Sequence, residues 1–245
     1  SVAGGIPIIR VIKEELVEIR YYPENVTNRQ NFWLMHHCIN EQKNKTKWLH
    51  YHALDERLFS PTGKRVIDIL KEYENYGGVS VAWEFFNSNG HINRPDGLVT
   101  DNFTTSLSDC DYHIKTIIQP QFAIVTIDNP HNFKFVAGKH AVDENLNIVT
   151  TAWNPGRYSF NKLKLHHYVT MSREEFDIKM DKGLLDHADT GNVRRSYAEE
   201  QWNSLHNKNL NFKENTDLLK YSKIIKQSIM NRYQHKKELL RYINH

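Results

Sequence analysis

The chain has 245 residues, a formal net charge of +3 and 39% hydrophobic residues, and its mean hydropathy is −0.66. This length suits one large domain or two small ones, and the hydrophobic content suffices for a packed core. No apolar run approaches the ~18–20 residues of a membrane span. The first residues have neither the basic region nor the apolar core of a signal peptide. We therefore expect a soluble, cytoplasmic protein without a membrane span in this chain.

Charge and cysteine content narrow the class of protein further. The basic excess lies mostly in the last third of the chain, within helices that also carry Asp and Glu, which is typical of a solvated helical face. A nucleic-acid binder usually concentrates its charge in a stripe, so we expect no nucleic-acid partner. The two cysteines, Cys38 and Cys110, fit a reducing compartment and give no sign of a disulfide framework.

The first part of the chain alternates helices and strands. We predict, in chain order, strands at 6–12 and 15–22, a helix at 31–42, a strand at 47–54, a helix at 63–73 and a strand at 79–83. In the last of these, Val79, Val81 and Trp83 share one face at the strand period of two. The order helix, strand, helix, strand is typical of an α/β fold.

The middle of the chain is predicted to be richer in strands. They fall at 112–118, 122–127, 134–136, 148–151 and 163–170. Ser172 and Glu175 then have the spacing of a capping box, in which each side chain bonds the backbone amide of the other. This box predicts a helix that runs to about Lys182 and stops at Gly183.

The chain after Gly183 is predicted to be purely helical, with helices at 192–206 and 216–243. Their pattern is amphipathic and brings no polar side chains together. We therefore expect a packing module or lid rather than an active site. The predicted domains are an α/β domain at 1–183 and an all-helical carboxyl-terminal extension at 184–245 that packs on it.

Candidate functional side chains follow the predicted strands, because open α/β sheets bind ligands beyond the carboxyl ends of their strands. Asp55 and Glu56 come directly after the strand at 47–54. A carboxylate there can hold a divalent cation, and the cation can neutralise a diphosphate. The alternative interpretation of this pair is a helix or turn cap.

Two further segments qualify. The loop from Trp83 to Asp96 combines an aromatic ring, a hydroxyl, an imidazole and a carboxylate, and its Pro-Asp-Gly sequence predicts a turn; the alternative is an ordinary hairpin loop. His166 and His167 end the strand at 163–170, and adjacent strand residues point to opposite faces. One imidazole can therefore enter a site while the other packs, the alternative being a satisfied surface or core histidine.

Six motifs follow one another between residues 30 and 183. They are Trp48-Leu-His-Tyr-His-Ala-Leu-Asp-Glu, Trp83-Glu-Phe-Phe-Asn-Ser-Asn-Gly-His, Arg94-Pro-Asp-Gly-Leu-Val, Lys115-Thr-Ile-Ile-Gln-Pro, His131-Asn-Phe and His166-His-Tyr-Val-Thr-Met-Ser-Arg-Glu-Glu-Phe. Their types and their order resemble those of the family 92 and related family 2 glycosyltransferases. The amino-terminal nucleotide-binding segment of these families is not recognisable in this chain.

The resemblance implies a GT-A fold, which is a Rossmann-type mixed sheet with flanking helices. It also implies a nucleotide sugar donor (a UDP- or GDP-sugar), a glycan acceptor and a divalent cation, Mn²⁺ or Mg²⁺. Asp55 matches the second Asp of the family's Asp-x-Asp motif and, together with His167, is implied as a cation ligand. Ala53 stands at the first Asp. Lys115 matches a lysine expected near phosphate.

The same resemblance implies an acceptor side formed by Trp83 and the loop after it. The implied substrate-binding residues on this side are Trp83, Ser88, Gly90, His91 and Arg94. In an inverting transfer a carboxylate deprotonates the acceptor hydroxyl, and we expect Asp96 to be this base, with Glu56 as the second choice. The implied activity is transfer of a hexosyl or pentosyl group in glycan biosynthesis. Because Ala53 replaces an Asp, the alternative is an inactive carbohydrate-binding or scaffold protein on the same fold.

Overall fold

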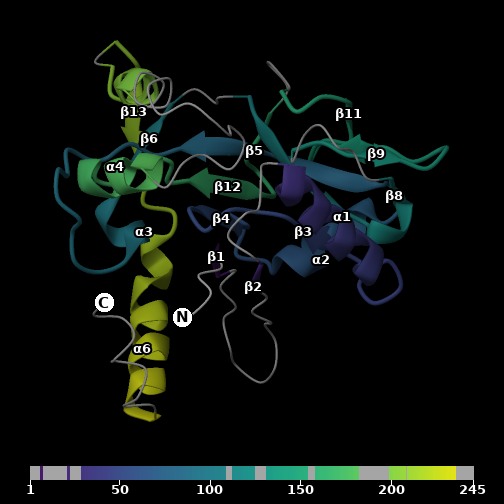
Figure 1. Ribbon diagram of the computed structural model, residues 1–245, viewed down its shortest axis with the longest axis horizontal. Coiled ribbons are helices and arrows are strands. Elements are labelled where there is room, and N and C mark those ends of the chain that lie inside the picture. Colours follow the sequence, from purple (N-terminus) through teal and green to yellow (C-terminus); the bar gives the residue numbers. More distant parts are fainter. Residues whose placement is uncertain are drawn as a thin grey trace.

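The computed structural model describes residues 6–7, 21–22, 29–108, 112–124, 131–153, 158–181, 199–207 and 209–235. Its centre is a mixed seven-stranded sheet (Figure 1). The strands of this sheet are β3 (Leu49–His50), β4 (Glu56–Phe59), β5 (Gly78–Phe85), β7 (Ile114–Ile118), β10 (Ala141–Val142), β11 (Ile148–Val149) and β12 (Lys164–His167). The predicted mixed α/β architecture is confirmed.

Strand β5 is the central strand, because its eight residues pair with three other strands. It runs parallel to β10 at its start and parallel to β12 at its end, and antiparallel to β7. Strand β4 lies antiparallel to β12, β11 antiparallel to β10, and β3 antiparallel to β7. As a result, β5 and β12 end at the same edge of the sheet, and the functional loops start from that edge.

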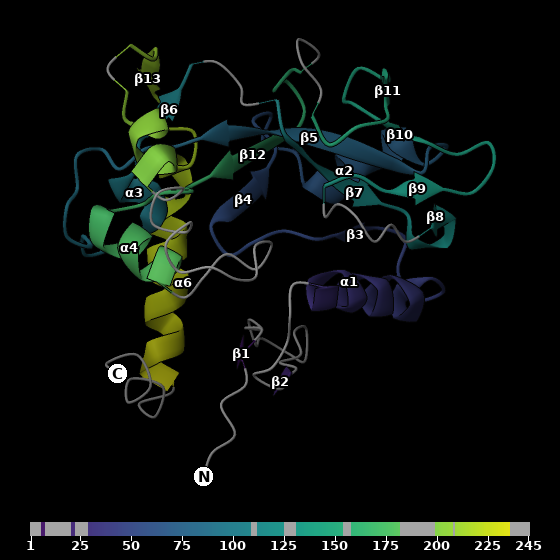
Figure 2. The ribbon, with the colours of Figure 1, turned by 45° about the horizontal axis from the view of Figure 1, so that its top comes forward.

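Helices lie at both ends of the sheet and against one of its faces (Figure 1). They are α1 (Arg29–Gln42), α2 (Val66–Leu70), α3 (Val99–Asn102), α4 (Arg173–Asp181), a helix at 199–205 and α6 (Leu219–His235), with short 3₁₀ turns η1 (Lys71–Tyr73) and η2 (Pro120–Phe122). In Figure 1, α3, α4 and α6 gather at the end to which β5 and β12 point. Figure 2 shows α1 at the other end, below β3. No helix among the described residues is both long and apolar enough to cross a bilayer.

Three further two-stranded sheets complete the fold. They pair β1 (Ile6–Pro7) with β2 (Tyr21–Tyr22), β6 (Thr105–Leu107) with β13 (Phe212–Glu214), and β8 (Ala123–Ile124) with β9 (Lys134–Phe135). The pair of β6 and β13 joins the carboxyl-terminal extension to the α/β domain. The extension therefore contains a strand besides its helices, which the sequence pattern did not predict because three residues are too short to show a period.

The hydrophobic core lies between β5, β12 and the helical turn α2–η1. Val79, Val81 and Leu165 pack there against Ile69 and Tyr73, and each is at most 4% exposed. The indole of Trp83 borders this core and is only partly buried. The shared face of Val79, Val81 and Trp83 is thus confirmed, and its last member is the one that reaches the edge of the sheet.

The strand predicted at 47–54 is shorter than expected. Only β3 is extended, and the chain turns before Glu56, which begins β4 instead of following a strand. The turn is closed by the Glu56 amide, which donates to the Ala53 carbonyl oxygen at 3.2 Å. Polar side chains at the turn favour this local closure over a longer strand.

Two other boundaries also differ from the prediction. The helix predicted at 63–73 begins only at Val66, because Gly63 is left-handed with φ of +80° and Arg65, directly before the helix, is extended. Strand β10 was not predicted, since two residues carry no periodic signal. Cys110, Gly183 and most of the strands predicted at 6–12 and 15–22 lie outside the described residues, as do the start of the helix predicted at 192–206 and the end of the helix predicted at 216–243.

The capping box is confirmed at the start of α4. The Ser172 hydroxyl accepts from the Glu175 amide at 3.2 Å, and the Glu175 carboxylate accepts from the Ser172 amide at 3.3 Å. The Ser172 hydroxyl also donates to that carboxylate at 2.8 Å. This reciprocal bonding gives partners to two backbone amides at the helix start that would otherwise lack them. It therefore fixes where α4 begins after β12.

The position of the central core predicts which leucine matters most for the free energy of unfolding. Leu165 is fully buried on β12, whereas Leu54 is 72% exposed. We expect Leu165→Ala to lower the free energy of unfolding by about 2–5 kcal/mol, since it removes buried methyl groups and leaves a cavity. The same change at Leu54 should stay within about 0.5 kcal/mol. Urea unfolding of the two variants compares them directly, and equal losses would contradict the position of the core.

Candidate functional site

Five of the sequence-predicted residues meet at the edge where β5 and β12 end. They are Asp55, Glu56, Trp83, Lys115 and His167, and we call them the edge cluster. The strand registers bring them together: His167 lies opposite Glu56, Leu165 opposite Trp83, and Val81 opposite Lys115. Carboxylates, an indole, an ammonium and an imidazole therefore face one place at the carboxyl ends of two parallel strands.

Glu56 fixes the indole of Trp83. Its side chain is fully buried, and its Oε1 atom accepts a hydrogen bond from the Trp83 Nε1 at 2.7 Å. The Oε2 atom accepts from the Ala53 amide at 2.7 Å, and the Lys115 Nζ lies 3.9 Å from Oε1. A buried carboxylate needs such partners to offset its lost hydration. The arrangement holds the indole in one orientation at the edge of the sheet.

Asp55 lies between an imidazole and an ammonium. Its Oδ2 atom is 3.6 Å from the His167 Nε2 and 2.6 Å from the Lys179 Nζ. Burial raises the pKa of Asp55, but the hydrogen bonds and charges of His167 and Lys179 outweigh burial and hold the pKa well below its usual range. Asp55 is therefore a carboxylate near neutral pH.

Sequence reasoning missed Lys179. It lies in the last turn of α4, and its ammonium also donates to the Val169 carbonyl oxygen at 3.1 Å. The residue matches no motif, and only the position of α4 against the sheet brings it to Asp55. The helix start fixed by the capping box thus also places a cation at the site.

Rings surround the Trp83 indole. The ring centroids of His167, His131 and His113 lie 4.4, 4.9 and 5.7 Å from that of Trp83. The Lys115 Nζ lies 5.7 Å from the Trp83 ring centroid and 5.2 Å from that of Tyr51. The motif around His131 was visible in the sequence, but its contact with Trp83 depends on the fold.

Two imidazoles near Lys115 are held neutral. Burial, followed by the charge of Lys115, lowers the pKa of His131 to about 4. Burial, followed by the charges of His52 and Lys115, lowers the pKa of His50 to about 3. The surroundings of Lys115 are therefore rich in uncharged imidazole at neutral pH, and Lys115 itself is only 5% exposed.

The other predicted substrate-binding residues form the loop that follows β5. Ser88 is buried, and its hydroxyl lies 2.8 Å from the His206 Nε2, just after the helix at 199–205. The Gly90 amide donates to the Ser88 hydroxyl at 3.2 Å, with a φ of +79° that favours glycine. The His91 ring packs edge-on against Phe103 with centroids 5.5 Å apart. The carboxyl-terminal extension therefore holds this loop in place.

Arg94 and Asp96 lie further along the same loop. The Arg94 amide donates to the Glu174 carboxylate at 2.8 Å, and its side chain is 76% exposed, with the Nε 3.5 Å from the Glu175 Oε1. Asp96 is exposed, and its carbonyl oxygen accepts from the Asn102 side chain at 2.9 Å. These contacts tie the loop to α4 and α3. That Trp83 and Asp96 share one acceptor pocket stays a prediction.

His166 and His167 point to opposite faces of the sheet, as predicted. His167 faces Asp55 and Trp83, whereas the His166 Nε2 lies 3.4 Å from the Glu84 Oε2. Burial, which outweighs the carboxylate of Glu84, lowers the pKa of His166, so the imidazole is neutral near pH 7. His167 therefore faces the edge of the sheet, whereas His166 is 1% exposed and packs against the rings of Phe59 and Phe86.

The lowered pKa of His131 gives a pH prediction. The unfolded chain takes up a proton on His131 near its ordinary pKa of 6.5, and the folded chain does so only near 4. Because the unfolded state then binds more protons, His131 makes the fold less stable as the pH falls through this window. In His131→Gln the loss of unfolding free energy between pH 7 and pH 5 should be smaller than in the wild type, whereas the same change at the exposed His36 should keep the wild-type loss. Denaturant unfolding at both pH values measures this.

Two comparisons with known proteins bear on this geometry. No curated protein matches the chain. The model of glycosyltransferase family 92 matches residues 9–217. This match extends beyond both limits of the resemblance in the sequence, 30 and 183, and it includes the whole edge cluster and the loop after β5. The chain therefore belongs to glycosyltransferase family 92, and its general chemistry is glycosyl transfer.

Proposed function

We propose that this protein transfers a sugar from a nucleoside diphosphate sugar, a UDP- or GDP-sugar, to a hydroxyl group of a glycan. The observation that carries the proposal is the edge cluster. Its acidic, basic and aromatic side chains converge beyond the carboxyl ends of β5 and β12, which is where open α/β sheets bind nucleotides. The family supports glycosyl transfer, and the edge cluster supports this choice of donor.

Asp55 and His167 are our proposed ligands for a divalent cation, Mn²⁺ or Mg²⁺. The Asp55 Oδ2 and His167 Nε2 atoms are 3.6 Å apart, and Asp55 is ionised. Such ions commonly take one or two protein ligands and complete their shell with substrate phosphates and water, so the pair fits a site that the donor completes. Ala53 adds no ligand and Lys179 competes for Asp55, which makes the site weak without donor. A bound cation supplies charge that stabilises the leaving diphosphate.

Lys115 and Lys179 are our proposed protein groups for the diphosphate. The Lys115 ammonium is buried beside Glu56 and Trp83, and the Lys179 ammonium lies on Asp55. Fixed positive charge in a site with little water stabilises negative charge that develops on a leaving group. The neutral imidazoles around Lys115 can donate hydrogen bonds without adding charge.

Trp83 is our proposed platform for the acceptor. An indole can pack on the apolar face of a sugar ring, and the bond from Glu56 fixes its orientation. Ser88, Gly90, His91 and Arg94 follow on the loop that starts from the same strand.

Asp96 remains our proposed base. Both oxygens of Glu56 already accept hydrogen bonds inside the protein, which suits a residue that positions Trp83. Asp96 is exposed in its turn, so a bound acceptor can approach it. A base must come within hydrogen-bond distance of the hydroxyl that it deprotonates, and Glu56 stays the second choice for this role.

A second candidate function is carbohydrate binding or a scaffold role without catalysis. It is favoured by the weak cation site: Ala53 replaces a carboxylate, and Lys179 already neutralises Asp55. An assay with a labelled nucleotide sugar distinguishes the two functions. Only a transferase releases nucleoside diphosphate from it, by transfer or by hydrolysis. The cytoplasmic location expected from the sequence stays a prediction.

Asp55→Asn tests the proposed cation site. The change removes the charge but keeps the size, so we expect Mn²⁺-dependent binding of UDP or GDP to weaken by at least about tenfold, since fewer charged ligands hold the ion. Asp68→Asn, in an exposed ion pair with Arg65 on α2, is the matched control and should bind as the wild type does. Calorimetry with and without Mn²⁺ measures both. Unchanged Mn²⁺-dependent binding in Asp55→Asn would refute the assignment.

Asp96→Asn tests the proposed base. We expect turnover to fall by roughly 10²–10⁴-fold while acceptor binding and thermal stability change little, because the residue is exposed and acts only on the transferred proton. Steady-state kinetics with a melting curve provide the readout, and Asp177→Asn on the exposed side of α4 is the control. Near-normal turnover in Asp96→Asn would show that Asp96 is only a turn residue, and Glu56 would then be the candidate base.

A further inference from the structure

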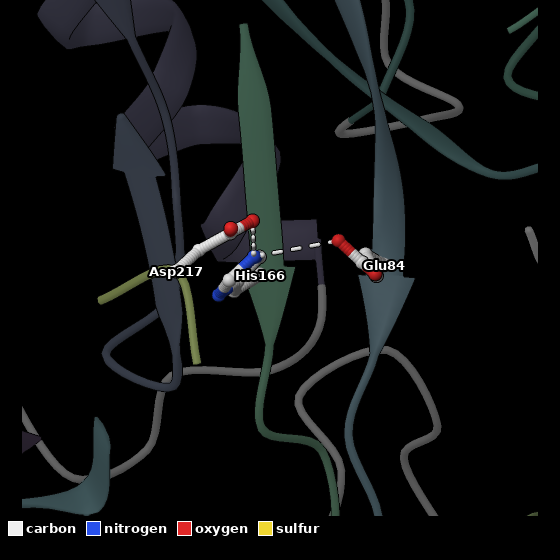
Figure 3. Close-up of side chains that lie close together, drawn as sticks. All are labelled: Glu84, His166 and Asp217. Atoms are coloured by element: carbon white, nitrogen blue, oxygen red, sulfur yellow. Dashed lines mark ion pairs between the residues drawn. The ribbon is translucent and has the colours of Figure 1, made fainter. Parts of the chain in front are cut away.

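A second group of potential metal ligands lies on the opposite face of β5 and β12 from the edge cluster. It consists of Glu84, His166 and Asp217, which we call the rear cluster. Each offers one ligand atom, and these atoms all lie within 4.8 Å of one another. The His166 Nε2 is 3.4 Å from the Glu84 Oε2 and 3.9 Å from the Asp217 Oδ2. Dashed lines mark these two ion pairs in Figure 3. Among the described residues, no other group of three such ligands lies together.

The rear cluster is assembled by register and by the extension. His166 on β12 lies directly opposite Glu84 on β5 in the parallel pair. Asp217 comes from the segment after β13, and its amide donates to the Asn215 side-chain oxygen at 3.1 Å. In Figure 3, Glu84 and Asp217 approach His166 from its two sides.

Two ligand atoms of the rear cluster are buried without a hydrogen-bond partner. Glu84 is 2% exposed and His166 is 1% exposed, yet the Glu84 Oε2 and the His166 Nε2 have no hydrogen bond. Buried polar atoms of this kind are rare in folded proteins, and each calls for an explanation such as an ion. Both atoms point toward the same place, between the three side chains.

The remaining polar atoms of Glu84 and His166 have partners outside the cluster, as the non-coordinating atoms of metal ligands usually do. The Glu84 Oε1 accepts from the Ser106 hydroxyl at 3.0 Å and from the Asn215 amide group at 2.8 Å. The His166 Nδ1 lies 3.4 Å from the Tyr168 hydroxyl. Outer partners of this kind orient metal ligands, and the tautomer in which the His166 Nδ1 donates to Tyr168 directs the Nε2 lone pair into the cluster.

The rear cluster already attracts positive charge. The Lys164 ammonium lies 2.6 Å from the Asp217 Oδ2 and 3.7 Å from the Glu84 Oε2. The Lys164 side chain is 15% exposed and that of Asp217 is 36% exposed, so the ion pair lies at the solvent-facing side of the cluster. Lys213 bonds the other oxygen of Glu84, Oε1, at 3.0 Å and does not compete for Oε2.

We propose that Glu84, His166 and Asp217 form a divalent-cation site, which the Lys164 ammonium occupies when no metal is bound. One imidazole nitrogen and two carboxylate oxygens, with a water as fourth ligand, match a first-row ion of the Zn²⁺ type. The bound ion fastens the segment 212–217 to the central sheet. This site is separate from Asp55 and His167 and does not depend on the proposed transfer reaction.

Titration of the full chain with Co²⁺, in the absence of nucleotide, tests the proposal. Co²⁺ replaces Zn²⁺ in tetrahedral sites and gives visible absorption bands there. We expect one equivalent of Co²⁺ to produce these bands and Zn²⁺ to abolish them. Asp217→Asn, which changes a partly exposed side chain and so spares the fold, should weaken this binding by at least about tenfold.

Two further variants make the test specific. Lys164→Gln should bind Co²⁺ more tightly than the wild type, because it removes the competing ammonium. Asp55→Asn should leave the Co²⁺ bands and affinity unchanged. Absence of tetrahedral bands, equal affinity in wild type and Asp217→Asn, or loss of the bands in Asp55→Asn would each overturn the proposal.

Discussion

The parallel pairing of β12 with the end of β5 is the constraint on which both polar clusters depend. It sets Leu165 opposite Trp83, His166 opposite Glu84 and His167 opposite Phe85. Because side chains alternate along a strand, this one register sends His167 to the edge cluster and His166 to the rear cluster. A slip by a single residue would exchange the two histidines and dismantle both clusters at once.

Buried charge on both faces of this pairing is compensated in the same way. Glu56 is fully buried and bonded to an indole and an amide, while Glu84 is bonded to a hydroxyl and an amide group. In each case a lysine stands near, Lys115 on one face and Lys164 on the other. A buried carboxylate without such partners would cost several kcal/mol. The central sheet therefore carries charge at its end only because the surrounding elements supply partners.

Those partners come from segments far apart in the chain. Lys179 reaches Asp55 from α4, whose start is fixed by the capping box of Ser172 and Glu175. His206 and Asp217 reach the sheet and its loop from the carboxyl-terminal extension. The extension thus does more than cover the α/β domain, since it holds the loop that follows β5 and completes the rear cluster. The match to family 92 also includes part of this extension, since it runs to residue 217.

The sequence by itself determined those features that depend on neighbouring residues: a buried strand face, the directions of two histidines and a helix start. The period of two along β5 gave the buried face of Val79 and Val81, and the adjacency of His166 and His167 gave their opposite directions. The spacing of Ser172 and Glu175 gave the start of α4, because the bonds of a capping box close within four residues. The order of motifs gave the family.

Only the tertiary structure decided which distant side chains meet. Strands β10 and β13 have two and three residues, too few for a period, and form only because a partner strand is present. Lys179 and Asp217 lie in no motif, and their neighbours Asp55 and His166 are far away in sequence. Such contacts depend on strand register and on how α4 and the extension pack, and these depend on the burial of the whole chain rather than on any local pattern.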